Sequence, residues 1–465
     1  MSVFFNMRNL NRNYDVIVVG AGAAGCLLSR NLAREEYSVC LVEKNDRNKL
    51  SHDWWDLVAT NIFDKVDIKP PESDELYKVG DFILCSPLDS IQVKKTPSGA
   101  YCNIDRRKFN NRILNEAIEN GANFYDNIEV IGPIFDEKTQ TIIGVRLDNS
   151  RIIKAKLIVD SSGYEGVIRS NIPFETEFDK KFRREDSFIT YREIRSKLPS
   201  VSDSHEIIIL GINRGASWVS FQQDNYVDFL GAYMDLLSAE ISPKKMVFKL
   251  IEKYKDKCGT KILKGGFGAS IPMRRALDSC VANGLIIIGD AACQIDPGTG
   301  SGVAMSLYAA HIASNVALQA LNIDSTRKED LWPYNVEYHR SEYNQQYSSN
   351  DIAIKNFHSL SEEEVEYVFA NDILDLRNFG GSSANATIIK KEKYRPKISI
   401  RSKILAHLTQ FAKLDKKIEE MKELCREYPE EYNHETFKTW REKMNNCYIV
   451  RYDLDKPFES ELVIS

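Results

Sequence analysis

Three glycines and one acid near the N-terminus have the spacing of a dinucleotide site. Gly20, Gly22 and Gly25 follow the apolar run Val16 to Val19 and fit the pattern G-x-G-x-x-G. The first glycine permits a tight turn, the second lets the backbone approach a pyrophosphate, and the third lets the next helix pack against the strand. A second apolar strand ends at Glu43, whose carboxylate can accept hydrogen bonds from an adenosine ribose. Together these features predict a bound dinucleotide, but they do not separate NAD from FAD.

A second glycine-rich stretch late in the chain narrows the choice to FAD. The run Leu285 to Ile288 predicts another buried strand, which ends at Gly289 and Asp290 and precedes a helix over about 302–321. Asp290 is placed to hydrogen-bond the ribityl or pyrophosphate part of FAD, and the positive end of the helix would stabilise the anionic reduced flavin. The expected cofactor contacts are Gly20, Gly22, Ala23, Ala24, Gly25, Glu43, Lys44, Arg106, Val130, Gly289, Asp290, Gly300, Ser301, Gly302 and Val303.

The other segments predict the rest of the architecture. Arg106 opens a helix with apolar residues along one face, and 141–147 and 151–159 have the composition of strands. Short apolar runs between about 170 and 280 indicate a sheet, with 226–235 as a half-exposed antiparallel strand. After about 325 the chain is polar and helical. The predicted fold class is α/β, with a Rossmann-like FAD-binding domain (1–170 and 265–325), an inserted antiparallel-sheet substrate domain (171–264) and a helical C-terminal region (326–465).

Composition excludes several classes of protein. The 465 residues carry a net charge of −5, which gives no sign of a nucleic-acid partner. The nine cysteines are scattered without a C-x-x-C pair, so we expect no metal, no iron–sulfur cluster and no disulfide framework. The first residues lack a secretory h-region, and no apolar run has the length of a membrane span, which favours a cytoplasmic protein. The basic segment Lys390 to Lys403 is suited to anionic lipid headgroups or an acidic ferredoxin, or is a solvated loop.

The order of these pieces resembles FAD-dependent oxidoreductases of the p-hydroxybenzoate hydroxylase type. More narrowly, the chain is similar to the geranylgeranyl reductase family, including archaeal reductases of membrane-lipid prenyl chains. The N-terminal fingerprint, Arg106, "TYRE" at 190–193, "GGFGASIPMRRAL" from Gly265 and the region of Asp290 carry the resemblance. It implies hydride transfer from reduced flavin to C=C bonds of prenylated lipids or prenyl diphosphates. It also implies an electron donor such as ferredoxin or NAD(P)H, and leaves open a peripheral contact with the membrane.

The substrate half departs from that family at two motifs. A family cysteine next to glycine is replaced by Trp54 and Trp55 in "SHDWWDLV" (51–58), while Asp56 is retained. Of the family's Y-x-W-x-F-P signature, the matching stretch 216–221 keeps only Trp218. The proton that the cysteine would supply is left to His52, Asp53, Asp56, Tyr191 or water. The expected pocket wall is Trp54, Trp55, Trp218 and Phe221, although core packing explains each tryptophan equally well.

Three other functions are weighed against a prenyl reductase. An FAD monooxygenase or halogenase acting on a small aromatic would usually carry an Asp-Gly pair where this chain has Asp160-Ser161-Ser162-Gly163, and the halogenase W-x-W-x-I-P signature is missing. A quinone-linked electron-transfer flavoprotein would need clustered cysteines. A flavin-binding protein without turnover is the remaining alternative.

Overall fold

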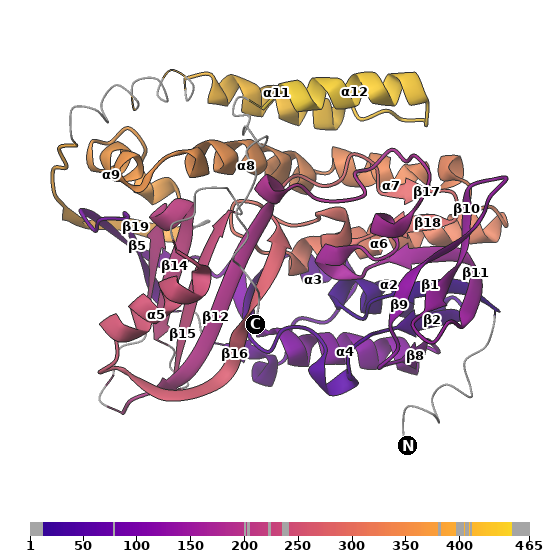
Figure 1. The fold of residues 1–465 in the computed structure, drawn as a ribbon, viewed down its shortest axis with the longest axis horizontal. Coiled ribbons are helices and arrows are strands. Elements are labelled where there is room, and N and C mark those ends of the chain that lie inside the picture. The colour runs from indigo at the N-terminus through magenta and orange to yellow at the C-terminus, as the bar shows by residue number, and fades with distance from the viewer. Residues whose placement is uncertain are drawn as a thin grey trace.

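The computed structural model describes residues 13–77, 80–199, 201, 205–221, 225–234, 241–379, 383–396, 404, 409 and 412–448. In this part of the chain, two eight-stranded sheets stand side by side beneath a layer of helices (Figure 1). A three-stranded sheet, β3 (Trp55–Ala59), β7 (Tyr101–Asp105) and β4 (Leu76–Tyr77), completes the β structure.

The first sheet is built on parallel strands in the order β17-β18-β11-β1-β2-β8. Successive residues of its central strands are buried, as expected of runs of valine, isoleucine and leucine covered on both faces, and α2 packs against both α4 and α6. The predicted strands and helices of this half are confirmed, within a few residues at their ends. They are β1 (Asn13–Val19), α2 (Ala23–Arg34), β2 (Val39–Val42), β10 (Thr141–Leu147), β11 (Ile152–Asp160), β18 (Leu285–Ile287), α4 (Arg106–Glu119) and α6 (Val303–Asn322). This half also contains α3 (Ile62–Lys65), β8 (Asn123–Tyr125), β9 (Val130–Asp136) and β17 (Val281–Ala282).

The second sheet takes strands from three distant stretches of the chain. Its order is β16-β12-β15-β14-β13-β5-β6-β19, and neighbours are antiparallel except β13 and β5. We expected this sheet within 171–264, but it also includes strands from 81–97 and 383–391, and β16 crosses the expected boundary at 264. Its strands are β5 (Asp81–Cys85), β6 (Ile91–Pro97), β12 (Ser187–Lys197), β13 (His205–Leu210), β14 (Gly215–Phe221), β15 (Tyr226–Met234), β16 (Cys258–Pro272) and β19 (Ser383–Lys391).

Strand β15 is buried on both faces, so the expectation of a half-exposed strand at 226–235 was wrong. Helix α5 (Pro243–Lys253) packs against one face so closely that a Cβ at Gly231 would lie 2.7 Å from the Pro243 carbonyl oxygen. The opposite face lies below α8 (Glu342–Ser359) and borders a cavity. Asp228 of β15 therefore faces the cavity rather than solvent.

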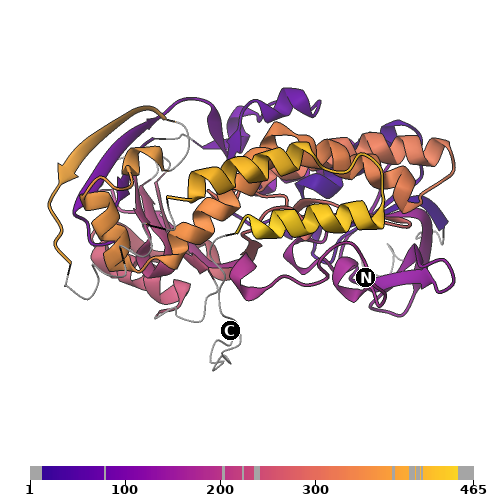
Figure 2. The same cartoon turned by 90° about the horizontal axis from the view of Figure 1, so that it is seen from above.

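The C-terminal helices form a layer over both sheets. Helices α7 (Lys328–Arg340), α8 and α9 (Glu362–Ala370) lie on the sheets, and α11 (Leu414–Arg426) and α12 (His434–Asn446) pack side by side above them (Figure 2). Trp332, Tyr428 and Trp440 fill the space between the two helical levels. Buried ion pairs of Asp186 with Arg274 and Lys355 fasten α8 to the body of the protein.

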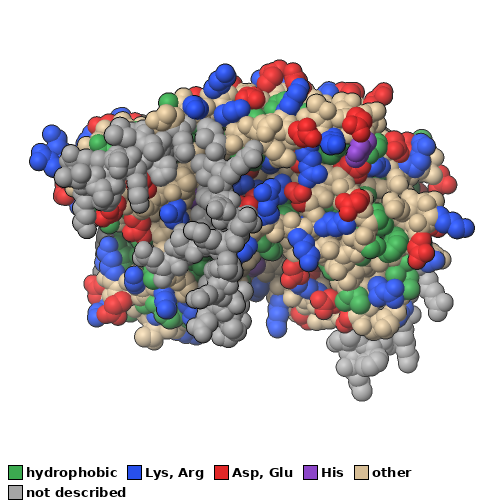
Figure 3. Space-filling view, turned by 45° about the horizontal axis from the view of Figure 1, so that its top comes forward, with side chains coloured by type: hydrophobic (Ala, Val, Ile, Leu, Met, Phe, Trp, Pro, Cys, Tyr) green, Lys and Arg blue, Asp and Glu red, His purple; other side chains and the backbone are tan. Residues whose placement is uncertain are grey.

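The outer surface over these helices carries both signs of charge. Figure 3 shows lysine and arginine side chains interspersed with aspartate and glutamate, in keeping with pairs such as Lys422 with Glu419 on α11. Within the described part of the chain, no helix combines the length and the hydropathy that crossing a bilayer requires.

Candidate active site

The glycine turn after β1 leaves a space at one of its three glycines. Gly20 has φ 100°, and a Cβ at Gly25 would lie 2.1 Å from the Gly20 carbonyl oxygen, so the packing of the chain itself requires both glycines. A Cβ at Gly22 would meet no atom within 4 Å. Helix α2 begins directly after Gly22 and has no side-chain cap, so its first N–H groups face this space. The turn therefore has room and donors for a phosphate group.

Glu43 holds this turn in place. Its carboxylate accepts hydrogen bonds from the backbone N–H of Ala21 and of Asn45, both at 2.9 Å, and the side chain is buried. Contact of Glu43 with a ribose stays a prediction. Two other expected contacts are engaged elsewhere, since Lys44 pairs with Glu165 at the surface and Val130 is buried in the core at the start of β9.

The second glycine-rich stretch meets the first. A Cβ at Gly289 would lie 3.6 Å from that of Ala24, and one at Gly302 would lie 3.2 Å from Asp290 Oδ1. Helix α6 begins after Gly302 with no side-chain cap, as α2 does after its own glycine. Among the described residues, no group donates a hydrogen bond to the Asp290 carboxylate, and burial raises the pKa of that carboxyl. This place therefore combines two uncapped helix N-termini, an open space at Gly22 and a carboxyl that accepts no hydrogen bond from the described residues. These groups fit the phosphates and hydroxyls of FAD.

Arg106 joins this cofactor end to the small sheet. It is the first residue of α4, which Asp105 caps, and its guanidinium donates to Asp56 Oδ2 on β3 at 2.8 Å. The backbone N–H of Arg106 donates to the Trp54 carbonyl. The second half of the "SHDWWDLV" segment lies in strand β3, and the segment brings Asp56 and the tryptophans next to the cofactor end.

A cavity of about 370 Å³ extends from this place across the second sheet. Its floor is the sheet, its cover is α8, and one end is formed by the loop 296–301 before α6. Much of its wall is apolar, from both the sheet and the helix. The apolar and aromatic residues that line it include Trp54, Trp55, Phe82, Leu84, Phe188, Ile208, Leu210, Trp218, Leu230, Ile271, Met273, Ile354, Phe357 and Phe379.

Three tryptophans surround one buried cation in this cavity. The guanidinium of Arg192 lies 5.3, 5.4 and 5.5 Å from the ring centroids of Trp54, Trp55 and Trp218. It donates to both carboxylate oxygens of Asp228, at 3.0 and 2.6 Å, and to the Trp55 carbonyl. The tryptophans thus line the cavity and also pack, so the two explanations we weighed for them are compatible.

Phe221 is placed less centrally than expected. It borders the cavity at the end of β14, but its ring lies 5.5 Å from that of Tyr254 in the hydrophobic cluster under α5. Sequence reasoning also missed Arg192, Asp228 and Glu206 as cavity residues. The alternation of β12 offered one signal, since it sets Arg192 on the face opposite Tyr191.

The candidates for the proton differ in position. His52 lines the cavity with its ring stacked on Trp54 at 4.3 Å, and burial together with nearby arginines lowers the pKa of His52 to about 3, so it is neutral at pH 7. Asp53 accepts a hydrogen bond from the Gly265 N–H. Tyr191 was a wrong choice, because it lies on the α5 face of β12 and donates to Glu193 at 2.9 Å. Asp56 lines the cavity beside Arg106.

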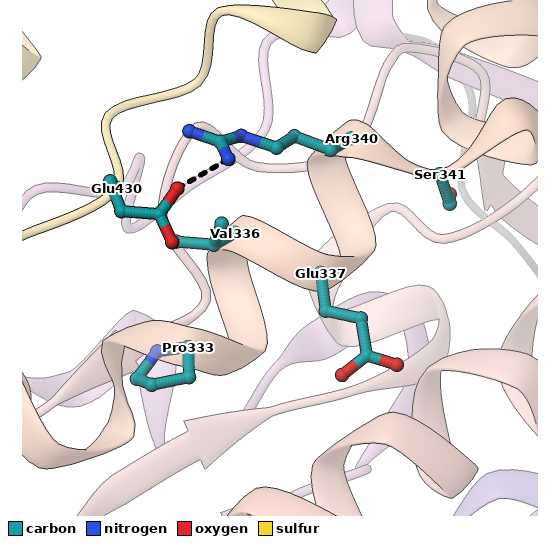
Figure 4. Close-up of a pocket in the computed structure, with 6 residues that line it drawn as sticks. All are labelled: Pro333, Val336, Glu337, Arg340, Ser341 and Glu430. Atoms are coloured by element: carbon teal, nitrogen blue, oxygen red, sulfur yellow. Dashed lines mark hydrogen bonds and ion pairs between the residues drawn. The ribbon is translucent and has the colours of Figure 1, made fainter.

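A second hollow, of about 410 Å³, lies outside this site on α7 (Figure 4). The side chains of Arg340 and Glu430 point toward one another across its rim and form an ion pair, and Glu337 points away from them. Arg340 also donates to the Tyr428 carbonyl, so its charge and donors are occupied. This hollow therefore lies where α7 packs against the segment between α11 and α12, and its charged groups already pair with one another.

Comparisons with known proteins agree with this geometry. A family model described as lycopene cyclase protein matches residues 15–176. The chain is 26% identical to digeranylgeranylglycerophospholipid reductase of Sulfolobus acidocaldarius over 447 residues, which is 93% of this chain and 97% of that one. It is 24% identical to digeranylgeranylglycerophospholipid reductase 1 of Methanococcoides burtonii, over 76% of this chain and 86% of the relative.

Solved structures share the fold. A geranylgeranyl bacteriochlorophyll reductase-like protein of Thermoplasma acidophilum superimposes with a TM-score of 0.68 at 18% identity, covering 88% of this chain and 99% of its own. A flavin-dependent brominase gives a TM-score of 0.56 at 17% identity, covering 78% and 91%. The fold is that of the FAD-dependent oxidoreductases of the p-hydroxybenzoate hydroxylase type. The predicted resemblance to geranylgeranyl reductases is confirmed as sequence similarity along nearly the whole chain.

Proposed function

We propose that this chain is an FAD-dependent reductase that saturates C=C bonds in the prenyl chains of lipids or prenyl diphosphates. The observation that carries the proposal is the long apolar cavity that begins at the cofactor end and crosses the second sheet. A row of facing residues, Arg192, Leu230, Trp218, Ile208 and Leu84, spans five strands of its floor. Four strand spacings amount to about 19 Å, which suits an extended chain better than a compact aromatic.

The chain's own residues would bind and orient the two reactants. The turn at Gly22, the Asp290 carboxylate and the start of α6 at Gly302 would hold FAD, which when reduced supplies a hydride. Trp54 and Trp218 would hold the alkene against it and keep water away, because hydride transfer requires close and lasting contact. The names of the relatives in Sulfolobus and Methanococcoides support this class of substrate.

We assign Asp56 as the residue that delivers the proton to the substrate. It lines the cavity at the cofactor end, its carboxylate is held by Arg106, and 24% of its side chain is exposed, so water reaches it. The Asp56 carboxylate would take up a proton from solvent and pass it to the alkene carbon that does not receive the hydride, which returns the carboxylate to its ion pair with Arg106. His52, neutral and stacked on Trp54, would shape the wall instead.

Contact with a membrane surface and with an electron donor belongs to the same proposal. Ile388 and Ile389 are exposed on the edge strand β19, next to Lys390 and Lys391. These two lysines already pair with Asp89 and Asp372, whereas Lys393 and Arg395 further along the segment are exposed, and 397–403 lies outside the described residues. The exposed isoleucines and these two basic side chains together support a peripheral contact with an anionic surface. Ferredoxin and NAD(P)H both remain proposed donors.

An anaerobic flavin assay tests the reductase proposal. The purified protein is reduced with dithionite, mixed with a geranylgeranyl lipid or geranylgeranyl diphosphate, and followed by flavin absorbance and product mass. Reoxidation with a gain of two hydrogens per saturated bond supports the proposal. Reoxidation only with oxygen and an aromatic compound would replace it with the monooxygenase alternative.

A further inference from the structure

A polar row crosses the floor of the apolar cavity. Asp228 on β15 is paired in register with Ser220 on β14, and Ser220 with Glu206 on β13. All three line the cavity, two residues along their strands from the apolar row Leu230, Trp218 and Ile208 and therefore on the same face of the sheet. Because residues in register lie about 5 Å apart, the row places a series of side-chain oxygen atoms across three strands of the channel floor.

The charges along this channel do not suit a phosphate. Among the described residues, two arginines line it, and each is paired with a carboxylate: Arg192 with Asp228 and Arg106 with Asp56. Glu206 and Asp296 add two further carboxyl groups to the wall. Both arginine charges are therefore already neutralised by carboxylates. A diphosphate in the channel would lie close to acidic side chains, and its burial there would carry a high desolvation cost.

Glu206 is suited to an uncharged partner. Burial, with Asp228 nearby, raises the pKa of Glu206 to about 7, so much of the population carries a proton at neutral pH. A protonated carboxyl both donates and accepts hydrogen bonds, and the Ser220 hydroxyl bonds to it from the next strand. These two groups match a hydroxyl, ether or carbonyl oxygen and offer little to a hydrocarbon.

We propose that Glu206 and Ser220, with Asp228 beside them, form a binding subsite for an uncharged oxygen function carried by an isoprenoid chain. The inference rests on the proposed function for the nature of the chain, but it concerns binding and needs no turnover. It places the oxygen-bearing end of the molecule inside the channel, and leaves a phosphate, where the substrate has one, outside it.

Tryptophan fluorescence provides the test, because Trp54, Trp55 and Trp218 line the channel. The FAD-loaded full chain is titrated with geranylgeraniol, with geranylgeranyl diphosphate and with an isoprenoid hydrocarbon of equal length. We expect the alcohol to bind up to about tenfold more tightly than the hydrocarbon, the gain of one buried hydrogen bond. Diphosphate that binds more tightly than the alcohol, or alcohol that binds no better than the hydrocarbon, would overturn the subsite.

Variants locate the effect. Glu206→Gln keeps an uncharged donor and acceptor, so its affinity for geranylgeraniol should stay within about threefold of the parent. Glu206→Leu should bind the alcohol about tenfold more weakly and the hydrocarbon no more weakly. The exposed Glu431→Leu is the control for adding a leucine. Equal alcohol affinity in Glu206→Leu and the control contradicts the subsite. If the variants show these affinities but the protein reduces no prenyl chain, the subsite is supported and the proposed reaction is wrong. If the protein reduces prenyl chains but the variants do not show these affinities, the reaction is supported and the subsite is wrong.

Discussion

Arg192 and Asp228 form a doubly hydrogen-bonded ion pair on adjacent strands, at 3.0 and 2.6 Å, in the middle of an apolar cavity. Both side chains are almost fully buried. The pair organises its surroundings, since Asp228 also accepts from the Trp218 indole at 3.3 Å and Arg192 donates to the Trp55 carbonyl. It thus joins the two segments in which this chain departs from the geranylgeranyl reductase pattern.

Breaking that pair should destabilise the protein strongly. Asp228→Ala removes the carboxylate that is hydrogen-bonded to the buried Arg192, and we expect a loss of about 3–5 kcal/mol in the free energy of unfolding. The double variant Arg192→Met with Asp228→Leu should recover most of that loss, because no charge then remains. Urea denaturation measures both. Equal stability of the single and double variants would mean that the pair contributes mainly through packing.

Two glycines of the fingerprint should fail in different ways. Gly22→Val places a side chain in open space, so we expect a folded protein of near-parental thermal stability that has lost FAD, because the side chain blocks the phosphate. Gly25→Ala places its Cβ against the Gly20 carbonyl and should lower the melting temperature of the apoprotein itself.

Absorbance at 450 nm and thermal melts of the apoproteins separate these two glycine effects. A yellow, FAD-loaded Gly22→Val protein would show that the cofactor lies elsewhere. An apoprotein of Gly25→Ala that melts with the parent would show that the chain relaxes around the new Cβ.

Replacing the Asp56 carboxylate should slow flavin reoxidation, whereas removing the Tyr191 hydroxyl should not. Asp56→Asn removes the proposed route of the proton and should slow prenyl-dependent flavin reoxidation by about 10²-fold or more, with FAD content retained. Tyr191→Phe should leave that rate unchanged, since its hydroxyl faces α5 and Glu193. Stopped-flow absorbance under anaerobic conditions gives both rates. A slow Tyr191→Phe enzyme beside a fast Asp56→Asn enzyme would reverse the assignment.

The sequence predicted features that depend on residues close together in the chain, and it missed features that depend on contacts between distant residues. The fingerprint turn, α4 opening at Arg106 and α6 after Gly302 were predicted within about a residue, because spacing and capping act over a few positions. The second sheet was only partly predictable, since β5 pairs with β13 and β19 with β6 across more than a hundred residues of sequence. The row of Asp228, Ser220 and Glu206 becomes visible only once the register of three strands is known. Tyr191 was misplaced because nothing in the sequence states which face of β12 borders the cavity.

Glu206 should make stability fall as pH rises. Its pKa lies at about 7 in the folded protein, against 4.5 normally, so the folded state holds a proton that the unfolded state has lost between these pH values. Below pH 4.5 both states are protonated and the group has no effect. From there to pH 7 the unfolded state binds fewer protons, and the free energy of unfolding should decrease by up to about 3 kcal/mol.

Glu206→Gln isolates this contribution. The amide keeps the size of the side chain and does not titrate, so the difference in unfolding free energy between variant and parent should widen in favour of the variant from pH 4.5 to 7 and then stay level. Urea denaturation in one buffer series of constant ionic strength measures it, with Glu431→Gln as the exposed control that should follow the parent. Parallel curves for parent and Glu206→Gln would mean that Glu206 ionises in the folded state as it does in water, and the channel would then carry a further negative charge at neutral pH.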